Sequence, residues 1–506
     1  RKQEVTNSDV RTSSPGIAPS IAPRNPYLGI MLPYTPLHHI LMRDLAFPVI
    51  ATSGNLSDEP ICTDEQEAVR RLSGIADFFL VHNRPIVRHV DDSIARVILG
   101  RELVIRRARG YAPLPVLLNT RLDAPILAVG GHLKNTVALA VGEQAFISQH
   151  IGDLETHQSL VAFRKATADL QTLYEAAPTT VVCDMHPDYI SSQDARRMTC
   201  PVVEIQHHYA HVAACMAENE LDGEVLGVSW DGTGFGLDGT IWGGEFLLAR
   251  DGSFERVATF RPFRLPGGEK AIKEPRRTAL GALYEVFGDA VFDELDLSSR
   301  YGFAAQEIDI IHRMLQKGLN SPLTFSVGRL FDAVASIIGL RHLVNFEGQA
   351  AMELEFAMAG DSSGEAYGFT MSDLRLPAPS GRDSGRRSTL AVDWSDTIRQ
   401  MRGDLLRGVP RSRVSIRFHN MLVEALLGVA DRIGVERIVL TGGCFQNRYL
   451  TEQAVQRLRA KGLRPYWHQR VPPNDGGIAL GQLYAWARAK SHRNRASAGS
   501  YQEAIG

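Results

Sequence analysis

Three glycine-rich segments, each directly after an apolar stretch, constrain the fold of this chain more than any other sequence feature. They are Gly-Gly-His-Leu-Lys-Asn at 130–135, Asp-Gly-Thr-Gly-Phe-Gly at 231–236 and Thr-Gly-Gly-Cys-Phe-Gln-Asn at 441–447. Glycine lets backbone N–H groups approach a phosphate closely, and a Gly-Gly pair at the start of a helix adds the positive end of the helix dipole. Spread over roughly 300 residues, the three segments indicate a two-lobed α/β nucleotide-binding fold with phosphate loops on facing hairpins.

The apolar stretches around these segments predict strands at 126–129, 136–141, 144–148, 225–230, 244–248 and 437–440. The second segment is then a turn, and the third leads into a helix. Candidate nucleotide-binding residues in the three segments are Gly131, Lys134, Asn135, Gly232, Thr233, Gly234, Gly442, Gly443 and Asn447. Lys134 is the cation of the first segment, although a lysine in one such loop alone is more often a surface residue.

A second pattern, His-His-Tyr-Ala-His at 207–211, predicts a metal site. It follows an apparent strand that ends at Ile205 and opens a run rich in Ala, Val and Met, which predicts a helix. His207 and His211 are four residues apart and share one helix face, where two imidazoles can bind one transition metal. His208 leaves the choice between an i,i+3 and an i,i+4 pair open. A histidine pair alone is more often a solvated or hydrogen-bonded helix face.

Two acidic residues complete the predicted metal site. Asp231 opens the second glycine-rich segment, and Asp475 lies in Asn-Asp-Gly-Gly before a helix. Two histidines and two carboxylates suit Fe(II) or Zn(II) and leave a position for water or substrate. This prediction requires the fold to bring together residues that are far apart in the chain.

The N-terminal part of the chain contains a second candidate anion site. A predicted strand at 47–51 runs into Thr-Ser-Gly-Asn-Leu-Ser at 52–57, which offers Ser53 and Asn55. Arg106 and Arg109 of a later basic segment could bind phosphate oxygens in pairs. An ordinary polar turn and a solvated strand edge are the alternatives for these two stretches.

Composition narrows the class of protein. The chain has 506 residues, of which 44% are hydrophobic and 22% charged, as in soluble proteins of two or more domains. A net charge of −2 gives no bulk attraction to nucleic acid or to a membrane. Five scattered cysteines without a C-x-x-C pair argue against a disulfide framework or a zinc ribbon and fit a reducing compartment. Without a recognisable signal peptide or spanning segment, we expect a cytoplasmic protein.

Taken together, the motifs resemble those of the HypF-type carbamoyltransferases, which are maturation factors of NiFe-hydrogenases. The motifs at 32–38, 52–57 and 106–113 are similar to the second part of a YrdC-like α/β domain. The glycine-rich segments, the histidine stretch and the Asn-Asp-Gly-Gly motif are similar to those of a TsaD-like domain with the two-lobed actin/sugar-kinase fold.

The resemblance implies a domain organisation. We expect a disordered lead-in at 1–26, the YrdC-like part at 27–116, a linker at 117–124, a TsaD-like carbamoyl-transfer domain at 125–490 with a mobile insertion at 360–390, and a tail at 491–506. HypF proteins usually begin with an acylphosphatase-like domain, zinc fingers and the first YrdC-like part. This chain is expected to lack all three and to be a truncated form, a fragment or a sequence with an internal region left out, for which transfer is better supported than adenylate formation.

The resemblance also implies a reaction. The YrdC-like domain of the family makes carbamoyl-adenylate from ATP and the carbamate of carbamoyl phosphate, and the TsaD-like domain transfers the carbamoyl group to the C-terminal cysteine of HypE. By this similarity the metal ligands are His207, His211, Asp231 and Asp475. Lys134 and the two histidines are then catalytic, and Ser53, Asn55, Arg106 and Arg109 bind ATP, which could bring Mg(II).

Three other functions share some of these features. A small-molecule O-carbamoyltransferase would carry the same motifs, and a non-catalytic actin-like ATP-binding scaffold could hold the His/Asp cluster as structure. A tRNA threonylcarbamoyl transferase fits less well, because the YrdC-like part and the Cys-Phe-Gln-Asn turn favour the HypF type. A nucleic-acid role rests on the short Arg106 to Arg109 patch alone, so we expect protein and small-molecule partners and no membrane.

Overall fold

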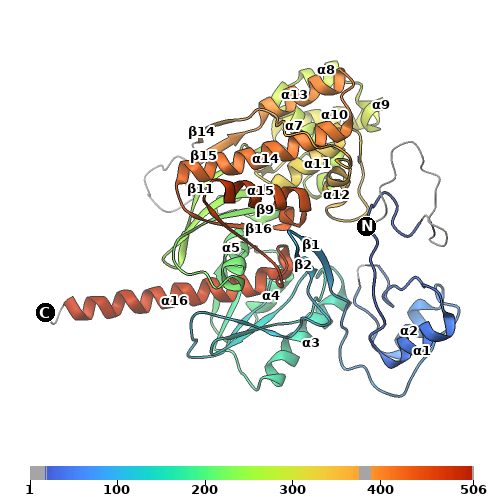
Figure 1. Cartoon of the computed structure of the whole chain (residues 1–506), viewed down its shortest axis with the longest axis vertical. Coiled ribbons are helices and arrows are strands. Elements are labelled where there is room, and N and C mark those ends of the chain that lie inside the picture. The colour runs from blue at the N-terminus through green and yellow to red at the C-terminus, as the bar shows by residue number, and fades with distance from the viewer. Residues whose placement is uncertain (1–17, 19, 58, 375–388, 504–506) are drawn as a thin grey trace. The chain divides into compact units, whose positions relative to one another are not determined.

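The computed structural model describes residues 18, 20–57, 59–374 and 389–503, and for 495–503 it describes only the backbone. The chain divides into two compact units, residues 1–54 and 55–506. The predicted lead-in at 1–26 lies largely outside the described residues. The first unit contains helix α1 (Pro36–Leu45), which begins where Thr35 Oγ1 accepts a hydrogen bond from His38 N at 3.2 Å (Figure 1).

The strand predicted at 47–51 is wrong. Residues 46–53 of the first unit are irregular. Pro48 has no N–H to donate, and the described part of this unit offers no neighbouring strand for the others to pair with. An apolar stretch becomes a strand only where a partner satisfies its backbone groups.

The second unit begins with helix α2 (Glu65–Leu72) and an antiparallel hairpin of β1 (Ile94–Ile98) and β2 (Arg101–Arg106). A six-stranded sheet follows. In spatial order it consists of β3 (Pro115–Leu117), β6 (Gln144–Ile147), β5 (Ala138–Val141), β4 (Ile126–Ala128), β7 (Thr180–Asp184) and β8 (Val202–Ile205). The first three pairings are antiparallel, and β4, β7 and β8 are parallel.

The three strands predicted around the first glycine-rich segment are confirmed as β4, β5 and β6. Residues 115–117, where the YrdC-like part was expected to pass into the linker at 117–124, form the edge strand β3, because their backbone pairs with β6. Helix α3 (His157–Leu173) covers one face of this sheet and buries Phe163 and Leu170 against it, and the short α4 (Ile190–Ala195) follows β7.

The second sheet is larger and mixed. Its strands are β14 (Thr370–Leu374), β15 (Thr389–Asp393), β11 (Ser253–Phe260), β10 (Ile241–Arg250), β9 (Val225–Phe235), β16 (Arg437–Thr441) and β17 (Arg464–Trp467) in spatial order, with β12 (Phe263–Arg264) and β13 (Leu323–Thr324) at one side. The predicted turn at 231–236 is wrong, because β9 continues to Phe235, which pairs with Ile241. The glycines permit a strand here because its neighbours approach too closely for side chains.

Helices cover the outer face of the second sheet (Figure 1). They are α6 (Glu269–Lys273), α7 (Pro275–Phe287), α8 (Ala290–Glu294), α9 (Leu297–Tyr301), α10 (Ala305–Lys317), α11 (Val327–Ile337), α12 (Gln349–Phe356), α13 (Ser395–Leu406), α14 (Arg411–Ile433) and α15 (Arg448–Ala460). The 3-10 turn η1 (Gly443–Gln446) joins β16 to α15. Trp230 and Phe246 of the sheet and Phe331 and Phe418 of the helices form the centre of this core.

Two helices form the layer between the sheets. Helix α5 (His207–Glu218) packs on β9, β10 and β16, and α16 (Ile478–Glu503) packs on α5 and on the six-stranded sheet (Figure 1). A Cβ on Gly481 would lie 1.8 Å from Ala210 O, so only glycine allows this approach. The turn η2 (Asp475–Gly477) precedes α16. The helix runs to Glu503, well past the point near residue 491 where we expected a polar tail.

The predicted insertion at 360–390 falls partly outside the described residues, at 375–388. On either side of that gap the chain forms β14 and β15, which pair antiparallel. Among the described helices, none combines the length and the apolar character that crossing a bilayer requires.

Candidate functional site

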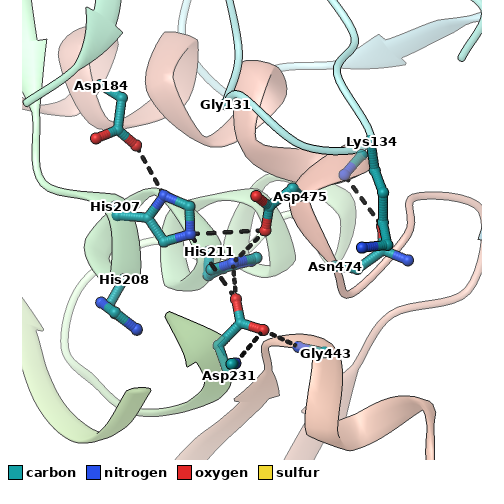
Figure 2. A network of polar contacts seen from close by, with 12 residues as sticks. Gly131, Lys134, Asp184, His207, His208, His211, Asp231, Gly443, Asn474 and Asp475 are labelled. Atoms are coloured by element: carbon teal, nitrogen blue, oxygen red, sulfur yellow. Dashed lines mark hydrogen bonds and ion pairs between the residues drawn. The ribbon is translucent and has the colours of Figure 1, made fainter. Parts of the chain in front are cut away.

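The candidate site lies where α5, β9 and η2 meet between the two sheets (Figure 2). Gln206 caps α5, because its side-chain oxygen accepts a hydrogen bond from the backbone N–H three residues later at 2.9 Å. The helix therefore begins at His207, and its first turn carries His207 and His211 on one face. Asp231 comes from β9 and Asp475 is the first residue of η2. The fold thus brings the four predicted ligands together.

The geometry of this cluster would allow it to hold a metal ion. One ligand atom from each of the four side chains lies within 4.8 Å of the others. His211 Nε2 is 2.8 Å from Asp231 Oδ2 and 3.6 Å from Asp475 Oδ1. His207 Nε2 is 3.6 Å from Asp475 Oδ1 and 3.8 Å from Asp231 Oδ2, and it has no hydrogen-bond partner among the described residues. The longer separations exceed a hydrogen bond but suit ligands that each lie about 2.0–2.2 Å from a common ion.

The charges in the cluster stabilise one another. Burial alone would lower the pKa of both imidazoles and raise the pKa of both carboxyl groups. Asp475 and Asp184 nevertheless raise the pKa of His207 well above its usual value, and Asp231 and Asp475 raise that of His211. The histidines in turn hold the pKa of both Asp231 and Asp475 below the usual range. Both carboxylates are therefore ionised and available to a divalent cation.

Asp184, at the end of β7, is a site residue that sequence reasoning missed. Its Oδ2 lies 2.7 Å from His207 Nδ1, and both side chains are buried (Figure 2). An ionised carboxylate can only accept, so the proton is on Nδ1 and the lone pair of a neutral His207 is on Nε2, toward the cluster. Carboxylate–histidine–metal arrangements use this contact to orient a ligand. The apolar strand before Asp184 was the available signal.

His208 does not join the cluster, which resolves the choice of spacing in favour of His207 and His211. The ring of His208 points away from the two aspartates (Figure 2). Its Nδ1 lies 3.3 Å from Gln206 Nε2, and burial together with His207 lowers its pKa well below the usual value. A neutral buried histidine beside the site is a packing residue.

The first glycine-rich segment lies against Asp475. A Cβ on Gly131 would be 3.3 Å from Asp475 Oδ2. Lys134 has a φ of +46°, and its N–H donates to Asp153 Oδ1 at 2.6 Å, which fixes the loop. Lys134 Nζ pairs with Glu347. Burial alone would lower the pKa of this lysine, but Glu347 and Asp475 raise it, so Lys134 is a cation beside the cluster.

The second and third segments hold one oxygen of Asp231. The N–H groups of Gly232 and Gly443 donate to Asp231 Oδ1 at 2.8 and 3.1 Å. Its Oδ2 is thereby left to face the histidines. Gly442 has a φ of +91°, and a Cβ there would lie 2.2 Å from Trp230 O, so this turn requires glycine.

Gly234 makes room for the histidine rings, whereas Thr233 beside it is only partly buried. A Cβ on Gly234 would lie 2.3 Å from His208 Cε1 and 2.9 Å from His207 Cδ2. The glycine therefore shapes the histidine side of the site.

Two of the predicted nucleotide-binding residues have structural partners. The buried Asn135 amide donates to the carbonyls of Val129 and Gly131 at 2.9 and 2.6 Å. Asn447 caps α15, and its Nδ2 lies 2.9 Å from His419 Nε2. Both asparagines shape glycine-rich segments. His419 is thus hydrogen-bonded at both ring nitrogens.

The four residues of the N-terminal candidate site are divided between the two units. Ser53 belongs to the first unit, and Asn55, whose Nδ2 donates to Leu56 O at 2.8 Å, to the second. Arg106 lies 3.9 Å from an oxygen of Asp91, and Arg109 lies 3.3 Å from an oxygen of Asp92. Both arginines are therefore in reach of acids as well as of solvent.

Solvent reaches the cluster of His207, His211, Asp231 and Asp475 at its carboxylates. The side chains of Asp231 and Asp475 are 11% and 14% exposed, whereas the histidines are buried. Two surface cavities of about 380 and 310 Å³ lie elsewhere. Their linings include Arg437 and Lys490, respectively, and no cluster residue.

Three family profiles match the chain. The profile described as "Carbamoyltransferase, Kae1-like Domain, second subdomain" covers residues 227–482, and the one described as "HypF Kae1-like domain" covers 121–218. A Sua5/YciO/YrdC profile, described as "Telomere recombination", covers 8–108.

Curated relatives agree with these profiles. The carbamoyltransferase HypF of Synechocystis sp. is 44% identical over 489 residues, which are 94% of this chain and 61% of that protein. A HypF homolog of Cupriavidus necator is 35% identical over 385 residues, which are 72% of this chain and 92% of that protein. The chain thus spans about 61% of the length of the longer Synechocystis relative.

Solved structures support the predicted fold class. A crystal structure of full-length HypF in the phosphate- and nucleotide-bound form has a TM-score of 0.83 and 42% identity, covering 92% of this chain and 71% of that one. The structure of T. kodakarensis HypF has a TM-score of 0.81 and 28% identity, covering 93% and 61%. An α/β protein with a YrdC-like part and a Kae1-like, that is TsaD-like, domain is therefore confirmed.

Proposed function

The chain belongs to the HypF carbamoyltransferase family, and from that premise we propose that it transfers a carbamoyl group from carbamoyl-adenylate to the C-terminal cysteine of a HypE partner. One observation carries the proposal. The cluster of His207, His211, Asp231 and Asp475 adjoins all three glycine-rich segments, two of which bind Asp231 while the first contacts Asp475. A candidate metal site and candidate phosphate loops thus lie together, which supports the proposal. The nucleotide-bound HypF structure supports ATP as the source of the adenylate.

The four side chains would hold Fe(II) or Zn(II), which supplies a Lewis acid for the phosphate or the carbamoyl oxygen. Asp184 orients His207, and the N–H groups of Gly232 and Gly443 orient Asp231. These contacts preorganise the site before substrate arrives, so little reorganisation accompanies the reaction.

The protein's part in the transfer is to bind and neutralise the leaving group. The acceptor sulfur bonds to the carbamoyl carbon, the bond from that carbon to the phosphate oxygen breaks, and AMP leaves with the electron pair while the thiol proton passes to solvent. Lys134, held as a cation by its acidic neighbours, would neutralise the charge on the departing phosphate. The nucleophile belongs to the partner. Cys444 lies within the third glycine-rich segment. Burial and Asp231 raise the pKa of its thiol, which opposes formation of a thiolate there.

The adenylation half of the proposal rests on the YrdC-like part. Ser53, Asn55, Arg106 and Arg109 are proposed to bind ATP, with Mg(II) as its counter-ion. Carbamoyl phosphate would supply the carbamate. The proposal places the reaction in the cytoplasm, where HypE would be the protein partner.

The test is to incubate the chain with ATP, carbamoyl phosphate and purified HypE and to weigh HypE by mass spectrometry. We expect a carbamoyl adduct on the C-terminal cysteine, no adduct on HypE whose cysteine is replaced by serine, and none with the His211→Gln chain. Nucleotide turnover without an adduct would instead support the ATP-binding scaffold. Carbamoylation of a small-molecule hydroxyl in place of HypE would support the O-carbamoyltransferase.

To separate the two half-reactions, synthetic carbamoyl-adenylate can replace ATP and carbamoyl phosphate. Transfer from the synthetic adenylate alone would assign these 506 residues to the second step. Failure of transfer with both donors would contradict the proposed function.

A further inference from the structure

Glu347, in the loop before α12, reaches across to the first glycine-rich segment. Its Oε2 forms a close ion pair with Lys134 Nζ, although the two residues are 213 positions apart in the chain. Lys134 belongs to the loop between β4 and β5 of the six-stranded sheet, and Glu347 belongs to the helical layer over the second sheet. The pair therefore joins the two halves of the second unit beside the candidate site.

The other oxygen of Glu347 lies next to the second glycine-rich segment. A Cβ placed on Gly232 would lie 3.6 Å from Glu347 Oε1 and 3.1 Å from Arg329 Nη2. The buried Arg329 forms an ion pair with Asp332 at 2.9 Å, while its Nε has no partner in the described part of the chain. A carboxylate thus sits beside Gly232, with Lys134 on one side and Arg329 on the other.

This carboxylate is partly open to solvent, whereas the backbone of Lys134 is held in place. The side chain of Glu347 is 41% exposed, and Gly348 follows it with a φ of +78° and no atom within 4 Å of its Cβ position. The backbone of Lys134 is held by Asp153. A partly exposed ion pair of this kind contributes only about 0–1 kcal/mol, so a ligand can displace Glu347 at little cost.

We propose that Glu347 is a charge-selecting residue of the nucleotide site, where its carboxylate competes with nucleotide phosphate for Lys134 and so disfavours highly charged nucleotides. The inference rests on the proposed function, because it takes the glycine-rich segments as the nucleotide site. An acyl-adenylate carries one ionised phosphate oxygen, whereas ATP carries several. Repulsion from the Glu347 carboxylate grows with the charge of the ligand. The site would thereby accept the adenylate in the presence of excess ATP.

The test compares ATP, AMP and adenosine as titrants by calorimetry. Glu347→Gln keeps the size of the side chain and removes its charge. We expect ATP to bind about fivefold more tightly, a change of about 1 kcal/mol, AMP to gain less, and adenosine to bind unchanged. Glu353→Gln, which removes an acid of the neighbouring α12 that pairs with Arg341, should leave all three affinities unchanged.

A second pair of variants assigns the effect to this site rather than to the YrdC-like part. In a Lys134→Gln background, Glu347→Gln should no longer tighten ATP, because the contested cation is gone. If Glu347→Gln leaves ATP affinity unchanged or weaker while the wild type binds ATP, the role of Glu347 is contradicted and the proposed function stands. If the wild type binds none of the three titrants, the nucleotide site itself is wrong and both proposals fall.

Discussion

Asp184 Oδ2 lies 2.7 Å from His207 Nδ1, and the opposite nitrogen of the same ring faces Asp475 Oδ1 at 3.6 Å. The ring is therefore fixed at one edge by a buried carboxylate and presents Nε2, which carries the lone pair when the ring is neutral, at the other. In metal sites of this kind the outer carboxylate contributes to affinity without touching the ion.

Replacing Asp184 with Asn should weaken metal binding by about 10- to 100-fold while leaving the four ligands in place. The neutral amide no longer enforces a proton on His207 Nδ1, so Nε2 is protonated in part of the population. A Zn(II) titration against a chelator of known affinity measures the change.

The control is Asp188→Asn, which neutralises an exposed acid four residues further along. An affinity for Zn(II) equal to that of the wild type in Asp184→Asn would show that His207 needs no orienting partner.

Gly234→Ala should distort the histidine side of the site. The added methyl group would start 2.3 Å from His208 Cε1 and 2.9 Å from His207 Cδ2, so a ring or the strand must move. We expect a loss of about 1–3 kcal/mol in the free energy of unfolding together with weaker metal binding. Urea denaturation and the same Zn(II) titration measure both.

Gly364→Ala is the matched control, because a Cβ there meets no atom within 4 Å and its φ is not in the left-handed region. If Gly234→Ala is as stable as Gly364→Ala and binds Zn(II) normally, the close approach of β9 to α5 does not shape the site.

Much of this site was predictable because the local sequence around each ligand carries a recognisable pattern. His207 and His211 were assigned by their spacing, and Asp231 and Asp475 by their glycine-rich surroundings. Asp184 was not, because its role depends on β7 lying beside β8, the strand that leads into His207. The order of strands in a sheet is a tertiary property that a strand's own residues do not encode.

The same limit explains the errors. The glycines of β9 resemble a turn, since nothing near them in sequence reveals that the histidine rings of α5 occupy their side-chain space. Residues 47–51 do not form the predicted strand, because the described part of their unit contains no neighbouring strand to pair with. Glu347 lies in the loop before α12, and its contact with Lys134 in the other half of the unit could not be foreseen from either stretch of sequence.

His419→Gln should change how stability depends on pH. His419 Nδ1 donates to Ser415 O and Nε2 accepts from Asn447, and burial lowers its pKa from 6.5 to about 4. As the pH falls, His419 of the unfolded chain is therefore protonated near pH 6.5, whereas His419 of the folded chain is protonated only near pH 4. The contribution of His419 to the free energy of unfolding is complete above about pH 6.5 and is lost as the pH falls toward about 4.

Denaturation at about pH 7.5 and about pH 5 measures the effect, and His419 should account for roughly 2 kcal/mol of the loss on acidification. Glutamine does not titrate, so the His419→Gln chain should lose correspondingly less. An identical loss in both proteins would mean that the histidine is not held neutral by its two hydrogen bonds.

The central claim is that four side chains from distant parts of the chain hold one ion, and metal analysis after anaerobic loading with Fe(II) or Zn(II) tests it most directly. We predict about one tightly bound ion per chain in the wild type and in folded His208→Ala, whose ring lies outside the cluster, and loss of that ion in His207→Ala and Asp475→Asn. Equal metal content in the wild type and His207→Ala, or a wild type that retains no metal, would contradict the account.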